Sequence, residues 1–182
     1  MSLLDSLKRL VGAAPPSPTE QLYAAVVAQA RRPAWYIDGG VPDTMDGRFD
    51  VLVLALALLM LRLEDETGDN PRHPAAQLSA NLADRFITDM EGNLRQDGIG
   101  DQAVPKHMGR MMAALGGRIG AYRSGRRDRA AMADALQRNL YRGSDVPPGA
   151  VQWVISEAHS LTAQLDACDF AQLGAGILKL HD

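Results

Sequence analysis

Val51-Leu-Val-Leu-Ala-Leu-Ala-Leu-Leu-Met-Leu61 is the most apolar stretch of the chain, with Arg48 and Asp50 before it and Arg62 after it. A helix needs about 20 apolar residues to cross a bilayer, and this run has 11. A helix that is apolar on every side but too short to span is typical of the centre of a soluble bundle. The run therefore predicts a central helix over about 46–66 and no transmembrane segment.

The rest of the chain also has the periodicity of helices. Apolar residues recur every three or four positions, and no stretch of useful length alternates as a strand would. The expected helices cover about 18–31, 75–96, 104–127, 129–142, 148–166 and 169–180. A chain of 182 residues usually forms one domain. The sequence therefore predicts an all-α fold, a single-domain bundle of six to seven helices.

The composition is that of an ordinary globular protein. Hydrophobic residues make up 46%, charged residues 23%, and the net charge is −3, which argues against disorder and against general nucleic-acid binding. Cys168 is the single cysteine, so the chain can form neither an internal disulfide nor a thiolate metal site, and it fits a reducing compartment.

Residues 1–18 are expected to form an amphipathic segment and a proline-rich linker, ahead of a helical domain over 19–182. Four leucines at positions 3, 4, 7 and 10 share one helical face, and the stretch is too short and too evenly charged for a signal peptide. The segment is predicted to rest on a membrane surface or a partner, or to fold back on the domain.

No catalytic or metal-binding motif is found, so the chain is not expected to be an enzyme or to need a cofactor. The four histidines have no metal-ligand spacing, and no phosphate-binding glycine loop or nucleophile elbow occurs. Asp43, Asp46 and Asp50 cluster at the start of the central helix, where carboxylates complement the helix dipole. The alternative is a cation or acid–base site in a small-ligand module.

The predicted helix 104–127 is unusually rich in glycine. Each glycine in a helix interior costs about 1 kcal/mol relative to alanine. Gly109, Ala113, Gly116 and Gly120 fall on one narrow face at steps of 4, 3 and 4, and such a strip lets another helix backbone approach closely. Either a helix of the same domain packs there or a partner helix does.

The same region is basic. Residues 106–129 contain seven basic residues and only one acidic residue, Asp128. The basic residues are Lys106, Arg110, Arg118, Arg123, Arg126, Arg127 and Arg129. Such a patch commonly meets phosphate, on lipid or RNA, or an acidic protein surface; a solvated face is the alternative. No aromatic residues are interleaved for base stacking, so no sequence-specific nucleic acid is expected.

Two long stretches of the chain have the character of sequence motifs. The first is Ala30-Arg-Arg-Pro-Ala-Trp-Tyr-Ile-Asp-Gly-Gly-Val-Pro-Asp-Thr-Met-Asp-Gly-Arg-Phe-Asp50. The second is Phe86-Ile-Thr-Asp-Met-Glu-Gly-Asn-Leu-Arg-Gln-Asp-Gly-Ile-Gly-Asp101. Both resemble the ubiquinol–cytochrome c chaperones, assembly factors of respiratory complex III. The likeness covers about 20–125 and departs at Ala114-Leu-Gly-Gly-Arg118, where relatives often carry aromatic residues.

The resemblance implies an all-helical, non-catalytic protein that binds newly made cytochrome b until haem and partner subunits are added. A bacterial-type member would work in the cytoplasm, peripherally at the inner membrane, with the ribosome and a second assembly factor as further partners. The motif positions that it marks for partner binding are Trp35, Tyr36, Asp43, Arg48, Asp89, Arg95, Asp101, Lys106 and Arg118.

The glycine-rich helix adds Gly109, Arg110, Ala113, Gly116, Gly120 and Tyr122 to the candidate partner-binding residues. Its small-residue strip and its basic residues are expected to be adjacent parts of one docking surface. A regulatory helical adaptor with a soluble partner is the remaining alternative to a chaperone.

Overall fold

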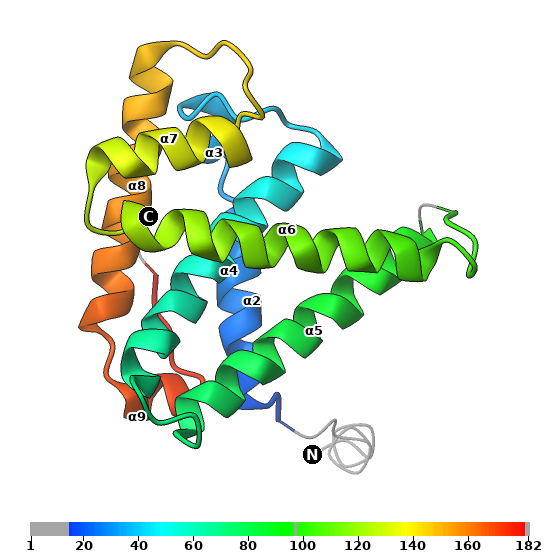
Figure 1. Ribbon diagram of the computed structural model, residues 1–182, viewed down its shortest axis with the longest axis vertical. Helices are drawn as coiled ribbons and strands as arrows, with labels where there is room; N and C mark the ends of the chain where they lie inside the picture. The colour runs from blue at the N-terminus through cyan, green and yellow to red at the C-terminus, as the bar shows by residue number, and fades with distance from the viewer. Residues whose placement is uncertain (1–14, 97, 181–182) are drawn as a thin grey trace, which may run out of the picture.

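The computed structural model describes residues 15–96 and 98–180. The helices are α2 (Pro18–Ala30), α3 (Ala34–Ile37), α4 (Met45–Thr67), α5 (Pro74–Gln96), α6 (Val104–Gly125), α7 (Arg129–Asn139), α8 (Pro148–Ala167) and α9 (Phe170–Gly174), and the described residues contain no strand. The predicted all-α bundle is confirmed, and residues 15–180 contribute six long helices and two short ones, position 97 aside. Figure 1 shows their arrangement. Most of the segment predicted over 1–18 lies outside the described residues.

Helix α4 is the central helix that the apolar run predicted. It contacts α2, α5, α6 and α8, and every residue from Val51 to Leu59 is buried. Thr44 caps its first turn by accepting a hydrogen bond from the amide of Gly47. Within the part of the chain that the structure describes, no helix is both long and apolar enough to cross a membrane.

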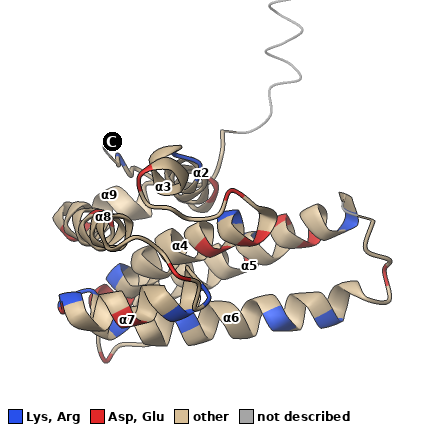
Figure 2. Cartoon of the chain, turned by 90° about the horizontal axis from the view of Figure 1, so that it is seen from above, with Lys and Arg blue, Asp and Glu red and all other residues tan. Residues whose placement is uncertain are grey.

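Helices α5 and α6 form an antiparallel pair whose connected ends extend beyond the body of the bundle (Figures 1 and 2). The predicted apolar stripe of α5 is buried, and its members are Leu78, Leu82, Phe86, Met90 and Leu94. Near its C-terminal end α5 therefore still packs its apolar side inward, while α6 crosses in front of α4. Helix α6 packs on α4, α5 and α7, whereas α2 packs on α4, α5 and α9. Because α2 and α6 diverge on either side of α4, a space remains between them.

Two segments differ from the sequence-based expectation. The predicted loop after α2 contains the short helix α3, because Trp35 is buried and its indole donates a hydrogen bond to the Gln29 carbonyl. The predicted helix 169–180 stops at Gly174. Gly176 then takes a φ of 77°, and a Cβ there would lie 2.8 Å from Pro18 Cα, so close approach to α2 ends the helix.

A buried ion-pair cluster joins three parts of the fold. Asp50 of α4 is 1% exposed; Arg118 of α6 bonds its Oδ1 at 2.5 Å and Arg142 bonds its Oδ2 at 2.7 Å. Arg118 also donates to the Asn139 carbonyl at the end of α7. A buried carboxylate is tolerated because cations and hydrogen bonds replace its water. The cluster therefore ties α4, α6 and the segment after α7 together.

Breaking this cluster should destabilise the fold strongly. We expect Asp50→Asn to lower the free energy of unfolding by about 3–5 kcal/mol, because Arg118 is left as an uncompensated buried cation. The matched control is Asp43→Asn, whose partner Arg48 is largely exposed, with an expected loss below about 1 kcal/mol. Urea unfolding measures both, and equal losses would contradict this assignment.

Candidate functional site

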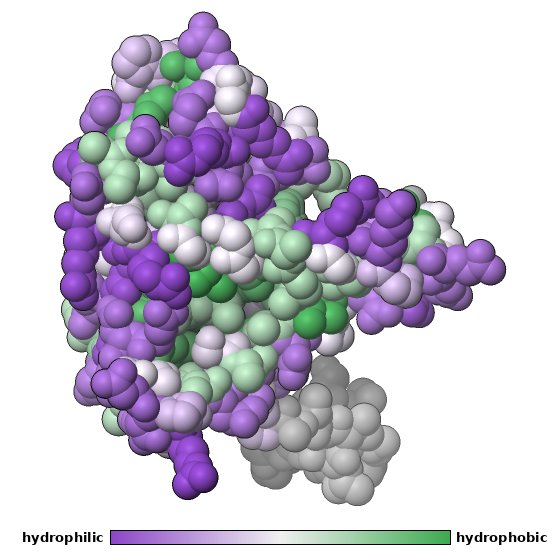
Figure 3. Space-filling model, viewed as in Figure 1, coloured by the Kyte–Doolittle hydropathy of each residue, from purple (hydrophilic) through white to green (hydrophobic). Residues whose placement is uncertain are grey.

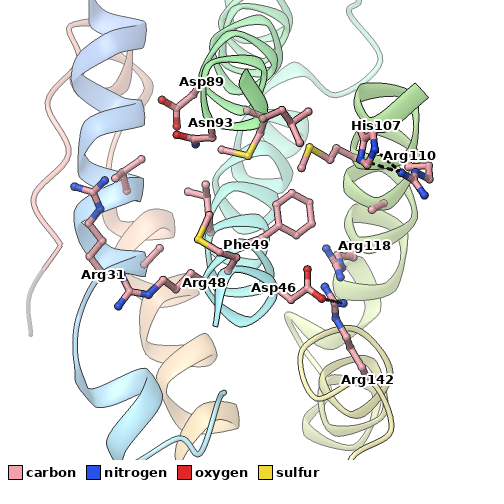
Figure 4. Close-up of a pocket in the computed structure, with 18 of the residues that line it drawn as sticks. Arg31, Asp46, Arg48, Phe49, Asp89, Asn93, His107, Arg110, Arg118 and Arg142 are labelled. Carbon is pink, nitrogen blue, oxygen red and sulfur yellow. Dashed lines mark hydrogen bonds and ion pairs between the residues drawn. The ribbon is translucent and has the colours of Figure 1, made fainter. Parts of the chain in front are cut away.

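An open groove of 670 Å³ lies where α6 diverges from α2, with α4 and α5 forming its base (Figure 4). The lining residues come from segments far apart in the sequence. They are Val27, Ala30, Arg31, Tyr36, Met45, Asp46, Arg48, Phe49, Leu52, Asp89, Met90, Asn93, Leu94, His107, Arg110, Met111, Ala114, Arg118 and Arg142.

The floor of the groove is apolar and rich in methionine. Phe49 and Leu52 project from the first turns of α4, with Met90 from α5 and Met111 from α6 beside them. Met45 at the start of α4 is 65% exposed. Methionine side chains are flexible and polarisable, so they adapt to apolar partners of different shape. The floor can therefore accept an apolar segment without demanding one exact sequence.

Charged side chains line the walls of the groove. Arg31 and Arg48 lie on one side of Phe49, and Arg110 lies on the α6 side (Figure 4). Arg48 bonds Asp43 at 2.7 Å, and this hydrogen bond holds the pKa of Asp43 below its ordinary value. The lining contains five arginines, completed by Arg118 and Arg142, against the two aspartates Asp46 and Asp89.

The three aspartates at the start of the central helix are held in ion pairs. Asp43 pairs with Arg48, Asp46 pairs with Arg142 at 2.6 Å, and both oxygens of Asp50 accept bonds from arginines. These contacts perform the structural duty that the helix start required. They also occupy both oxygens of Asp50 and one oxygen each of Asp43 and Asp46, the groups on which the alternative, a cation or acid–base site, depends.

The small-residue strip of α6 faces away from the groove. Gly109, Gly116 and Gly120 would meet nothing within 4 Å if each gained a Cβ, and Ala113 between them is exposed. By helical periodicity this strip lies on the opposite side of α6 from Met111. Among residues 15–96 and 98–180, no helix of the domain covers the strip. In Figure 3 the surface along the middle of α6 is white to green, so the residues exposed there are weakly polar to hydrophobic.

Four of the seven residues of the predicted basic surface pair with acids from other helices, and they are Arg118, Arg123, Arg126 and Arg127. Arg123 pairs with Glu64 at 2.6 Å, and Arg126, which is 8% exposed, bonds both Asp65 and Asp166. The other partners are Asp50 for Arg118, Asp65 for Arg127 at 3.9 Å, and Ser156 for Arg129. The expectation of one continuous basic patch beside the glycine strip is thus corrected. The two buried members, Arg118 and Arg126, link α6 and its C-terminal end to other helices of the bundle.

Comparisons with known proteins identify a family and a solved structure that are similar to this chain. The sequence model of the family described as ubiquinol-cytochrome C chaperone matches residues 38–180. The chain belongs to this family. A solved structure described as the Cbp3 homolog from Brucella abortus is similar, with 31% sequence identity, a TM-score of 0.79, and coverage of 99% of this chain and 97% of that chain. No curated protein is matched.

The match to the ubiquinol–cytochrome c chaperone family covers more of the C-terminal part of the chain than the sequence motifs did. Those motifs covered about 20–125, whereas the family match continues through α7 and α8 to residue 180. Chaperone membership points to a non-enzymatic role in the assembly of complex III. It also gives the groove and the exposed face of α6 a functional context.

The structure places the motif residues of this chaperone in three locations. Tyr36, Arg48, Asp89 and Arg118 line the groove, together with Arg110, a candidate from the glycine-rich helix. Arg95, Asp101 and Lys106 lie at the end of the α5–α6 pair, where Arg95 bonds Glu91. Trp35 is fully buried, as is Tyr122 from the glycine-rich helix, so both side chains support the fold and present no surface to a partner.

Sequence reasoning missed Arg31, Met45, Phe49, Met90 and Met111 as groove residues. Met90 was expected as part of the buried stripe of α5, and the others belong to helices whose mutual placement no local pattern reveals. One signal was available: Met108, Met111 and Met112 fall within two turns of one helix, and clustered methionines are typical of adaptable binding surfaces.

The exposed glycines should be destabilising for the isolated protein. We expect Gly116→Ala and Gly120→Ala each to raise the free energy of unfolding by about 0.5–1 kcal/mol, because alanine is the better helix former and open space receives its Cβ. Gly125→Ala is the control and should destabilise, since its Cβ would lie 2.9 Å from Met132 Cα. Thermal unfolding gives the comparison; a loss of stability at position 116 or 120 would contradict the exposed placement.

Proposed function

We propose that this chain binds newly synthesised cytochrome b and keeps it competent for assembly into the cytochrome bc complex. The family supports the assembly role, and the methionine-lined groove supports the choice of client. Cytochrome b is a membrane protein, so its unassembled segments present apolar helices to water. An open, apolar and adaptable groove matches that surface by the helix-in-groove mode.

The physical benefit to the client is burial of apolar surface. Removing apolar surface from water stabilises a complex by about 25 cal/mol per Å², although association entropy offsets much of this gain. Methionine adds tolerance, because several client helices can repack the same floor. A chaperone needs such tolerance together with release, and an open groove provides both.

The glycine strip is proposed as a second contact of the same chaperone. Its exposed backbone would allow a helix of the client or of a second assembly factor to approach α6 closely. The ribosome remains a proposed neighbour during synthesis, and we place the chaperone in the cytoplasm, peripherally at the inner membrane. Groove and strip lie on different sides of α6, so substitutions can separate their contributions.

Affinity purification from the native host tests the proposed function. The tagged full chain should recover cytochrome b, and removing the gene should lower the amount of spectroscopically detectable cytochrome bc complex. An intact bait that recovers no cytochrome b, together with normal levels of the complex in its absence, would refute the proposal.

Charge placed on the groove floor should abolish client capture. We expect Met45→Asp combined with Met111→Asp to reduce recovered cytochrome b roughly tenfold or more, because a carboxylate would have to be desolvated against an apolar client. Ile177→Asp, at a residue that is 48% exposed and outside the groove, is the control and should leave capture unchanged. Circular dichroism verifies that each variant is folded.

Filling the strip tests the second contact. Gly116→Leu with Gly120→Leu should leave the domain folded, since open space surrounds both positions, and should abolish the contact that depends on close helix approach. The measurement is recovery of cytochrome b and of any co-purifying assembly factor. Unchanged recovery of both in a folded variant would show that the strip is not a binding surface.

A further inference from the structure

Two arginines on opposite walls of the groove have no carboxylate partner among the described residues. Arg31 follows the end of α2, and Arg110 projects from α6, where its Nη2 contacts the ring of His107 alone. The other three lining arginines engage carboxylates, as described above. Between the two unpaired cations lies the apolar floor around Phe49 (Figure 4).

The inner end of the groove also has an unused donor. The Arg118 side chain is 10% exposed and stacks over Phe49, with its guanidinium carbon 5.3 Å from the ring centroid. Its Nη1 is buried and has no hydrogen-bond partner. A buried donor normally finds an acceptor, so this part of the site favours a ligand that carries oxygen acceptors.

We infer that the groove selects an amphipathic helix whose apolar face is bordered on both sides by carboxylates. The apolar face would lie on the floor around Met90 and Met111, and the flanking carboxylates would pair with Arg31 and Arg110. An acceptor at the inner end would serve Arg118. This inference deepens the proposed function, because it specifies the chemistry of the client segment that the groove accepts.

The arrangement of charge favours a helix over a lipid. A phospholipid places its phosphate at one end of its apolar chains, whereas here the unpaired cations stand on either side of an apolar floor. Carboxylates on both edges of an apolar stripe are a property of an amphipathic helix. Residues 1–14 of the chain itself have the wrong charge for the site, with Lys8 and Arg9 against Asp5.

Two fluorescent model peptides test the selection directly. Both are helices of about 20 residues, since shorter isolated helices are marginal in water, with a leucine face flanked by glutamate in one peptide and by lysine in the other. Anisotropy titration of the full chain should show at least about tenfold tighter binding of the glutamate peptide. Equal affinities, or preference for the lysine peptide, would overturn the inference.

Charge reversal identifies the residues responsible. Arg31→Glu with Arg110→Glu should weaken the glutamate peptide about tenfold or more and strengthen the lysine peptide. The matched control is Arg72→Glu with Arg138→Glu, which makes the same change of charge at exposed positions outside the groove and should leave both affinities unchanged. If both double variants lost affinity for the glutamate peptide to the same extent, the assignment of the binding site to Arg31 and Arg110 in the groove would be overturned.

Other occupants give distinct results. The inference would be overturned if phosphatidylglycerol vesicles, but not the glutamate peptide, competed for the groove. It would also be overturned if deletion of residues 1–14 tightened peptide binding, since that segment would then be the occupant. Dimerisation that the peptide disrupts would overturn it as well, because a second copy of the chain would then fill the groove. The proposed function is tested separately: a wild-type chain that recovers cytochrome b but does not prefer the glutamate peptide would refute the inference alone.

Discussion

The buried carboxylate of Asp50 and the two arginines that surround it connect the parts of this fold. Asp50 belongs to the central helix, Arg118 to α6, and Arg142 to the segment after α7. The buried charge needs these partners, so α6 is held against the first turns of α4 at this point. Beyond it α6 is free to diverge, and the groove opens where that divergence begins.

Helix α6 consequently has three different sides. One side packs into the bundle through residues such as Leu115 and Tyr122, a second contributes Met111 to the groove, and a third presents glycines to solvent. The glycines cannot be explained by internal packing, because nothing in the described part of the chain covers them. Both exposed sides suit helices that present an apolar face, which agrees with the family of assembly chaperones to which the chain belongs.

Charge in this protein is organised by tertiary contacts. The arginines near the end of α6 form a cationic run in the sequence, yet Glu64, Asp65 and Asp166 from α4 and α8 pair with them. Arg31 and Arg110, which are distant in sequence, instead have no carboxylate partner in the described part of the chain and stand on facing walls of one groove. A local count of charge therefore misjudged the strongest cationic feature, because neutralising partners came from helices elsewhere in the chain.

The sequence by itself determined the all-α fold, the burial of the central helix and most helix limits, because apolar periodicity and capping are local properties of the chain. Its long motifs also indicated the family. The tertiary structure alone decided that Trp35 and Tyr122 are buried, that the glycine strip faces solvent and that methionines from α4, α5 and α6 share one groove. Those facts depend on the angles at which helices cross, and these are set by side-chain packing between distant segments.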